Sequence, residues 1–184
     1  DVGQVLVTFH YSGICGSQLG EIEGVKGPDK WLPHLLGHEA SGTVLAVGPG
    51  VRYVKPQDRV VAHWRAGQGI ESSTPTYSWN GKIVNAGWVT TFNKHAVISE
   101  NRLTVIPKDT DLRTAALYGC AITTGLGTIE NKAKIRLGDR VVIFGAGGIG
   151  LNLIQGAVLA GAAEIVAVDL FENRLVLAKL MGAT

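Results

Sequence analysis

The stretch VVIFGAGGIG, residues 141–150, decides the fold class of the second half of this chain. Its apolar run is typical of a buried strand, and the run leads directly into a glycine-rich turn. The segment LNLIQGAVLAGA that follows predicts a helix, and EIVAVD, residues 164–169, predicts a second strand. A strand, a helix and a further strand in this order predict a parallel βαβ unit, the first part of a Rossmann α/β domain.

The glycines of this stretch predict a dinucleotide site, because positions 145, 147 and 150 have the G-x-G-x-x-G spacing. In such a turn Gly145 permits the tight bend, Gly147 lets the backbone approach a pyrophosphate, and Gly150 lets helix and strand pack closely. The loop, which also contains Gly148, would offer free N–H groups at the positive end of the helix. Asp169, 19 residues after Gly150, is placed to bind an adenosine ribose, which favours NAD over NADP. A glycine turn without a ligand is the alternative.

The first 110 residues are predicted to be rich in β-structure. Runs of β-branched residues bounded by glycine or proline predict strands near residues 3–13, 40–48, 58–64 and 94–100, and TVIP, residues 104–107, ends this region with Pro107 as a breaker. Strands at this spacing indicate a small barrel or sandwich. Within the polar insert between them, Asn80-Gly81 predicts the turn of a β-hairpin. Helices are predicted over 111–131 and 172–182, so we place the domain boundary between 112 and 113, giving domains 1–112 and 113–184.

Composition excludes several classes of protein. The net charge is +2 with scattered basic residues, which argues against a nucleic-acid or anionic-membrane surface. Residues 141–168 are apolar enough to suggest a membrane span, but their many glycines and the lack of flanking basic residues argue against one. Two cysteines make no disulfide framework, so we expect a reducing, cytoplasmic location. No signal peptide is visible and the chain does not begin with Met, so we expect it to be a fragment of a longer enzyme.

The two cysteines contribute to a candidate metal site. Cys15 lies in GICGSQ, Cys120 lies in GCAITTG, and LLGHEASG supplies His38 and Glu39. Two thiolates, one imidazole and an open position are the donors of a catalytic zinc site. A lone cysteine or histidine is more often structural, and this alternative stays open on residue types alone. A neighbouring nucleotide fold favours the metal, since hydride transfer benefits from an electrophile beside the reacting oxygen.

The order of these motifs along the chain carries a resemblance to a known family. GICGSQ, LPHLLGHEASGTV, DRVVAHW, GCAITTG, VVIFGAGGIG and VAVD follow one another over nearly the whole chain. Together they resemble the zinc-dependent medium-chain alcohol dehydrogenase family. The resemblance implies a GroES-like β-barrel catalytic domain followed by a Rossmann domain, of which this chain would contain only the first βαβ part.

The resemblance also implies roles for individual residues. The zinc ligands would be Cys15, His38 and Cys120, with Glu39 beside the metal or bound to it. Ser17 would pass the substrate proton, and Trp64 would line the substrate pocket. The cofactor contacts would be Thr124 near the nicotinamide, Ile149, Arg174 at the ribose, and the glycine loop with Asp169.

Three positions depart from the family pattern. Gln18 stands where many members have an acid that supports the zinc-bound histidine, and Gly20 stands where some members have a relay histidine. The four clustered cysteines of a structural zinc lobe are absent, so we expect one catalytic zinc and no structural zinc. The remaining histidines, His10, His34, His63 and His95, are expected to be structural or exposed, although His63 lies close enough to Trp64 to contact substrate.

The expected function is hydride transfer between NAD and an alcohol, polyol or sugar alcohol, or the corresponding carbonyl compound. The partners would be that small-molecule substrate and, for the full-length enzyme, further copies of the chain in a homo-oligomer. We expect the isolated piece to be a poor catalyst, because most of a Rossmann sheet is missing. The alternatives are a zinc-free quinone-reductase-like member of the same superfamily and a non-catalytic NAD-binding module.

Overall fold

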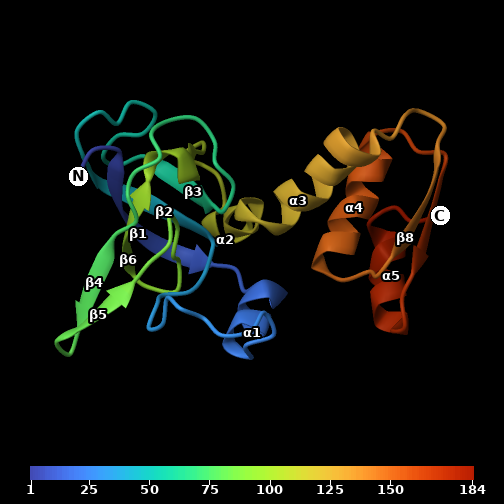
Figure 1. Cartoon of the computed structure of the whole chain (residues 1–184). Coiled ribbons are helices and arrows are strands. Elements are labelled where there is room, and N and C mark those ends of the chain that lie inside the picture. The colour runs from blue at the N-terminus through green and yellow to red at the C-terminus, as the bar shows by residue number, and fades with distance from the viewer. The chain divides into compact units, whose positions relative to one another are not determined.

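Alternating buried and exposed side chains organise the first half of the chain around one antiparallel sheet. The computed structural model describes residues 1–184, and its main sheet has the strand order β6-β1-β2-β3-β7 (Figure 1). The strands are β1 (Gln4–Ser12), β2 (Glu39–Val47), β3 (Arg59–His63), β6 (His95–Ser99) and β7 (Leu103–Val105). The first four were expected from the sequence, β7 was not, and every neighbouring pair is antiparallel.

The core of this sheet explains why the β-branched residues sit where they do. Val5 and Val7 of β1, Val44 of β2, Val60 of β3 and Ile98 of β6 are fully buried. Burying each such side chain stabilises the fold by about 1.5–3 kcal/mol. The register of β1 against β2 shifts twice, between Leu6 and Val7 and between Phe9 and Tyr11. These irregularities twist the strand that leads to the first cysteine.

Short helices connect the sheet to the residues of interest. They are α1 (Gly16–Ile22), the 3₁₀ turn η1 (Glu100–Arg102), α2 (Leu112–Ala115) and the 3₁₀ turn η2 (Ala116–Gly119). The Asp111 carboxylate caps α2, accepting hydrogen bonds from the Arg113 and Thr114 amides at 3.2 and 3.1 Å. Ser41 Oγ donates to the Leu112 carbonyl at 2.5 Å, which ties α2 to β2. The sequence predicted only a turn where α1 lies, because seven residues with two glycines carry little helical signal.

The predicted hairpin is present as β4 (Thr76–Trp79) and β5 (Lys82–Asn85). Asn80 and Gly81 have φ angles of 50° and 74°, the positive values that a two-residue turn of this type needs. The hairpin extends away from the main sheet in Figure 1, and the Tyr77 hydroxyl accepts a hydrogen bond from the Val97 amide of β6 at 2.8 Å.

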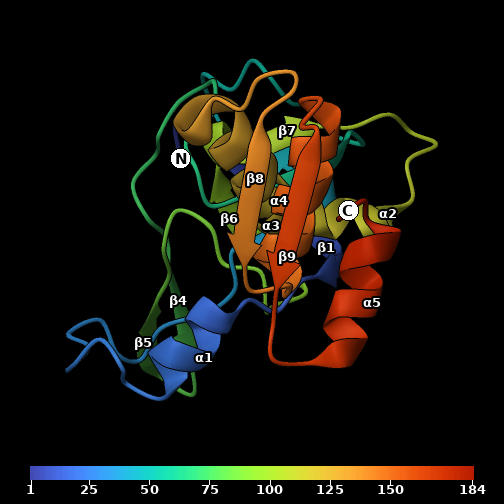
Figure 2. The same ribbon diagram turned by 90° about the vertical axis from the view of Figure 1, so that its right-hand side faces the viewer.

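The second half contains the predicted parallel pair. Its elements are α3 (Ala121–Gly127), the π-helix η3 (Thr128–Ala133), β8 (Arg140–Phe144), α4 (Gly148–Leu159), β9 (Glu164–Val168) and α5 (Glu172–Leu180). β8 and β9 run side by side in the same direction, with α4 against them (Figure 2). Ile143, Ile154 and Ile165 are buried between the pair and its helices. The order strand, helix, strand, helix therefore agrees with the pattern of residues 141–182.

The segment 111–131, which was expected to be helical, is helical in several pieces. The structure divides it into α2, η2, α3 and η3. The break is at Cys120, whose φ and ψ of −140° and −71° are not helical. The structure's two compact units are Asp1–Cys120 and Ala121–Thr184, because α2 and η2 pack on β2. None of the helices is both long enough and apolar enough to cross a bilayer.

Candidate metal and cofactor-binding sites

Three separate segments of the first unit bring Cys15, His38 and Cys120 together. Cys15 follows β1 and precedes the first helical residue of α1, His38 precedes β2, and Cys120 follows η2. One ligand atom from each of the three side chains lies within 4.8 Å of the other two. Neither cysteine is in a disulfide. The structure thus gathers two sulfur donors and one imidazole nitrogen near the end of β1 and the start of β2.

The electrostatics of the cluster favour metal-binding forms of these groups. Partial burial opposes ionisation of Cys15, but hydrogen bonds from the Ser17 hydroxyl, the Ser17 amide and the Cys120 thiol outweigh it and lower the pKa of Cys15. Desolvation also lowers the pKa of His38, which keeps its imidazole neutral at neutral pH. A neutral imidazole and readily formed thiolates are the protonation states that a metal requires.

The Glu39 side chain is buried against the backbone segments that lead to the two cysteines. The residue is 3% exposed. A Cβ at Gly13 would lie 2.5 Å from Glu39 Oε1, and a Cβ at Gly119 would lie 2.8 Å from Glu39 Cβ. The negative charge of Glu39 opposes ionisation of Cys15, which places the carboxylate within electrostatic range of the thiol. Glycines next to both cysteine segments therefore leave room for one buried carboxylate.

Gln18 fixes the orientation of His38. Its side-chain nitrogen Nε2 lies 2.6 Å from His38 Nδ1, and Gln18 is 5% exposed. The other end of the amide, Oε1, is buried without a hydrogen-bond partner. Because Gln18 contacts Nδ1 of His38, Nε2 is the ring nitrogen that remains available to a metal.

The two residues expected to pass the substrate proton and to line the substrate pocket, Ser17 and Trp64, are exposed. Ser17 is in the first turn of α1, where its hydroxyl contacts Cys15 and is open to solvent. Trp64 follows His63, which pairs with Glu39 across the sheet, so Trp64 lies at the strand end that carries His38. Its ring is 44% exposed and the guanidinium of Arg65 lies 5.4 Å from the ring centroid. His63 has a structural role, because its Nδ1 and Nε2 contact the Arg65 carbonyl and the Thr104 hydroxyl.

The glycine loop of the second unit has an open face. Gly147 precedes α4, and a Cβ built on Gly145, Gly147 or Gly148 would meet no atom within 4 Å. A Cβ on Gly150 would instead lie 1.7 Å from the Gly145 carbonyl oxygen. The loop is therefore closed on the side of Gly150, where helix and strand touch, and open where a ligand would approach.

Asp169 closes this loop from the end of β9. Its Oδ2 atom accepts a hydrogen bond from the Ala146 amide at 2.7 Å, and its Oδ1 atom accepts one from the Phe171 amide at 3.0 Å. These amides, with a further contribution from Arg174, lower the pKa of Asp169. The guanidinium of Arg174 lies 3.6 Å from Asp169 Oδ2 and 4.7 Å from the Phe171 ring centroid.

The other predicted cofactor residues lie on helices of the second unit. Ile149 is in the first turn of α4 and is 39% exposed. Thr124 is on α3, where its carbonyl accepts a hydrogen bond from the Thr128 hydroxyl at 2.7 Å. Both residues are accessible enough to contact a ligand.

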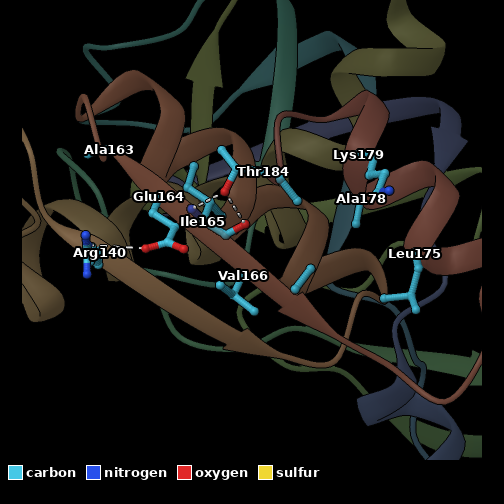
Figure 3. A pocket seen from close by; sticks show the side chains of 11 residues that line it. Arg140, Ala163, Glu164, Ile165, Val166, Leu175, Ala178, Lys179 and Thr184 are labelled. Atoms are coloured by element: carbon cyan, nitrogen blue, oxygen red, sulfur yellow. Dashed lines mark hydrogen bonds and ion pairs between the residues drawn. The ribbon is translucent and has the colours of Figure 1, made fainter.

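A separate cavity in this unit contains none of the predicted residues. It has a volume of about 630 Å³ and lies between β9, α5 and the end of the chain (Figure 3). Arg140 and Glu164, the first residues of β8 and β9, form an ion pair of 3.3 Å at its edge. The glycine loop follows the opposite, carboxyl end of β8, where ligands of parallel sheets bind. This cavity is therefore not the dinucleotide site.

The sequence missed one cluster of potential ligands. Glu21, Asp29 and His34 each offer an atom within 4.8 Å of the other two. Glu21 lies on the helix that the sequence did not predict, and no spacing rule joins it to the loop residues. The only signal was the proximity of several acidic residues to LPHLLGHE along the chain.

Comparison with known proteins gives consistent matches. Residues 1–108 match the alcohol dehydrogenase GroES-like domain. An S-(hydroxymethyl)glutathione dehydrogenase of Photobacterium damsela subsp. piscicida is 34% identical over 99% of this chain and 56% of its own length. The chain thus spans about half the length of the curated relatives it matches.

Solved structures give the same result. An alcohol dehydrogenase zinc-binding domain protein from Burkholderia ambifaria has a TM-score of 0.90 at 30% identity, covering 100% of this chain and 56% of that protein. Benzyl alcohol dehydrogenase from Acinetobacter calcoaceticus has a TM-score of 0.86 at 30% identity, with the same coverage of both chains. The GroES-like domain model matches more than half of this chain, and the similar proteins are dehydrogenases of the same type. The chain therefore belongs to the zinc-type medium-chain alcohol dehydrogenase family.

Proposed function

We propose that this chain is the part of a zinc- and NAD-dependent oxidoreductase that holds the catalytic metal and the first part of the nucleotide site. The enzyme would interconvert an alcohol and the corresponding carbonyl compound. The observation that carries the proposal is the convergence of Cys15, His38 and Cys120, which come from three distant parts of the sequence. Two thiols and a neutral imidazole are the donors from which a catalytic zinc site is built.

The donor set fits one zinc ion. Zinc sites of enzymes have three protein ligands and one open position, and cysteine with histidine is an established set of donors. We propose Cys15 Sγ, His38 Nε2 and Cys120 Sγ as ligands, with the Glu39 carboxylate beside them. Both cysteines of the sequence are used by this centre, so the chain has none left for a structural zinc lobe.

The residues around the centre would orient the substrate and move its proton. When bound, zinc supplies Lewis-acid polarisation of the substrate oxygen, and the nicotinamide ring supplies the hydride acceptor. Ser17, exposed beside Cys15, would take the hydroxyl proton and release it to solvent. Trp64 would form a wall of the substrate pocket. Gln18 would keep His38 in the orientation that directs Nε2 to the metal.

The glycine loop fits a dinucleotide. Its open face at Gly147 lies at the N-terminus of α4, a helix of 12 residues whose free N–H groups and dipole attract phosphate. We propose that Asp169 and Arg174 contact the adenosine ribose, and that Thr124 and Ile149 lie along the cofactor. Together with the parallel pair, this supports a Rossmann domain at residues 113–184, following a catalytic domain at 1–112.

The proposed substrate class is an alcohol, polyol or sugar alcohol. Two proteins that resemble this chain are named for benzyl alcohol and S-(hydroxymethyl)glutathione, which both carry a –CH2OH group. We further propose a cytoplasmic enzyme that forms a homo-oligomer at full length. The two cysteines, placed as metal ligands, are consistent with a reducing compartment.

Metal and nucleotide binding by the chain itself test the proposal. We expect about one equivalent of zinc at the thiolate centre by elemental analysis, and its loss in both Cys15→Ser and His38→Gln. His10→Gln is the matched control, because His10 is an exposed residue of β1 whose ring hydrogen-bonds with the Thr43 hydroxyl and which is not in the ligand cluster. NAD binding, followed by calorimetry, should survive these substitutions because the glycine loop belongs to the other unit.

The same data separate the alternatives. A zinc-free quinone-reductase-like enzyme or a non-catalytic NAD-binding module would bind NAD without any zinc that depends on Cys15. If both ligand variants bound as much zinc as the unmodified chain, the proposed centre would be contradicted. Simultaneous loss of zinc, NAD binding and helical circular dichroism in Cys15→Ser would show that the cysteine is structural.

A further inference from the structure

A second group of potential ligands lies at a cavity of the first unit, beside the thiolate centre but separate from it. The cavity, of about 590 Å³, is lined by residues of α1, by most of the loop from Asp29 to His38 and by residues 85–90 at and after the end of β5. His38 of the thiolate centre forms part of its wall. Glu21 of α1 and Asp29 and His34 of the following loop are among the lining residues. One ligand atom from each of these side chains lies within 4.8 Å of the other two.

The contacts of His34 show that its Nε2 atom faces negative charge. His34 Nδ1 lies 2.8 Å from the Leu35 carbonyl oxygen, which can only accept, so Nδ1 carries a hydrogen. His34 Nε2 lies 2.8 Å from Asp29 Oδ2 and 3.6 Å from Glu21 Oε1. Two carboxylates around one nitrogen need a positive charge between them, which a second proton or a cation supplies. An N–H bound to a backbone carbonyl is also how metal-binding histidines are oriented.

The wall of the same cavity contains a polar group without a partner. Gln18 is 5% exposed, and one end of its amide contacts His38 while the other end has no hydrogen-bond partner. A buried amide end of this kind is unfavourable unless something in the cavity bonds to it. Water bound to a cation donates its hydrogens, and such a water would satisfy Oε1, the unpartnered acceptor of Gln18. This observation is independent of the contacts among Glu21, Asp29 and His34.

We propose that Glu21, Asp29 and His34 form a second site, for a divalent cation, that ties α1 to the loop leading to His38. Its donors are oxygen and nitrogen only, which suits Zn²⁺, Mn²⁺ or Co²⁺ and sets it apart from the thiolate centre. Asp29 Oδ1 accepts a hydrogen bond from the Trp31 amide at 2.8 Å, which directs Oδ2 towards His34. The site adds an ion to the single zinc expected from the cysteine count.

The spacing of the ligand atoms is compatible with this site. Two ligands at about 2.1 Å from a tetrahedral zinc lie roughly 3.4 Å apart. The separation of 3.6 Å between His34 Nε2 and Glu21 Oε1 is already close to this value. Asp29 Oδ2, now 2.8 Å from Nε2, needs to move away by a few tenths of an ångström, and its side chain is partly exposed and free to do so.

Titration of the metal-free chain with ZnCl₂ tests the proposal. We expect two ions per chain by calorimetry, with one lost in Cys15→Ser and the other weakened at least about tenfold in Asp29→Asn. Glu21→Gln should weaken the same ion, and because Glu21 is exposed this variant leaves the fold intact. Glu23→Gln is the matched control, an exposed acid at the end of α1 that is not in the cluster.

Titration with CoCl₂ distinguishes the two sites. Cobalt at a centre with cysteine ligands gives an intense sulfur-to-metal absorption, whereas a site of oxygen and nitrogen donors does not. Asp29→Asn should remove one cobalt equivalent and leave that absorption unchanged. One ion per chain in the unmodified protein, no ion in Cys15→Ser, or two ions of unchanged affinity in both Asp29→Asn and Glu21→Gln would each overturn the proposal. None of these results depends on whether the thiolate centre is catalytic.

Discussion

The Nδ1 atom of His38 lies 2.6 Å from the side-chain amide of Gln18, so a neutral residue holds the imidazole of the candidate metal centre. A carboxylate in this position would add a full negative charge behind the ring. The amide offers hydrogen bonding alone, with either its oxygen or its nitrogen facing the ring. Gln18 therefore orients His38 without making it more basic.

This contact predicts the behaviour of Gln18 variants. Gln18→Ala should weaken zinc binding roughly 10–100-fold, because the ring of His38 loses its orienting partner. Gln18→Glu should restore the affinity, since a carboxylate oxygen accepts the Nδ1 hydrogen. Competition with a chelator measures both dissociation constants. Equal zinc affinity for the unmodified chain and Gln18→Ala would show that His38 needs no support.

Gly119 is predicted to be essential to the geometry of Cys120. A Cβ at this position would lie 2.3 Å from the Ala62 carbonyl oxygen, so Gly119→Ala must displace backbone. We expect a loss of about 1–3 kcal/mol in the free energy of unfolding, together with weaker zinc binding. Gly16→Ala is the control, because Gly16 adjoins the other cysteine and its Cβ would meet no atom within 4 Å. Urea unfolding and zinc titration of both variants check this difference.

Alanine substitutions at two glycines of the nucleotide loop are predicted to impair different properties, stability at one position and nucleotide binding at the other. Gly150→Ala places a Cβ 1.7 Å from the Gly145 carbonyl oxygen, so it should destabilise the second unit by about 1–3 kcal/mol or more. Gly147→Ala meets no protein atom and its φ of −80° suits any residue, so the fold should be retained. Its methyl group would instead occupy the space needed by a pyrophosphate. Thermal unfolding and NAD titration separate the two effects, and undiminished NAD binding by Gly147→Ala would argue against the proposed cradle.

Glu100 is predicted to make stability depend on acid pH. The residue is 1% exposed, and its carboxylate accepts hydrogen bonds from the Tyr53 and Ile70 amides, each at 2.8 Å, and from the Arg52 amide. Desolvation opposes its charge, but these amides outweigh it and hold the pKa of Glu100 below its ordinary value.

The sign of the pH effect follows from this lowered pKa. The stabilisation is fully present above the unfolded-state pKa of about 4.3 and is lost as the pH falls through the lower folded-state pKa. Glu100→Gln should cost about 1–3 kcal/mol at neutral pH, because charge-assisted hydrogen bonds are lost. Between about pH 6 and about pH 3 the unmodified chain should lose more stability than the variant. If the free energies of unfolding of the two proteins, measured with urea, changed equally with pH across this range, the assignment would be contradicted.

The strands and the nucleotide loop could be predicted because their signals are local. Alternating Val residues in β1 and the apolar run of β8 depend on neighbours a few positions away, as does the turn at Asn80-Gly81. The break at Cys120 could not be predicted, because an alanine-rich segment favours a helix by itself. Packing of α2 and η2 on β2 overrides that preference in the folded chain.

The sequence by itself determined the residue types of the metal centre, the glycine spacing of the nucleotide loop and the order of strands and helices. Only the tertiary structure decided that Cys15, His38 and Cys120 meet, and that Glu21 approaches Asp29 and His34. The physical reason is that periodicity and turn chemistry act over a few residues, whereas ligand geometry depends on how distant segments pack. A short helix such as α1, which has little stability of its own, acquires its place only from those tertiary contacts.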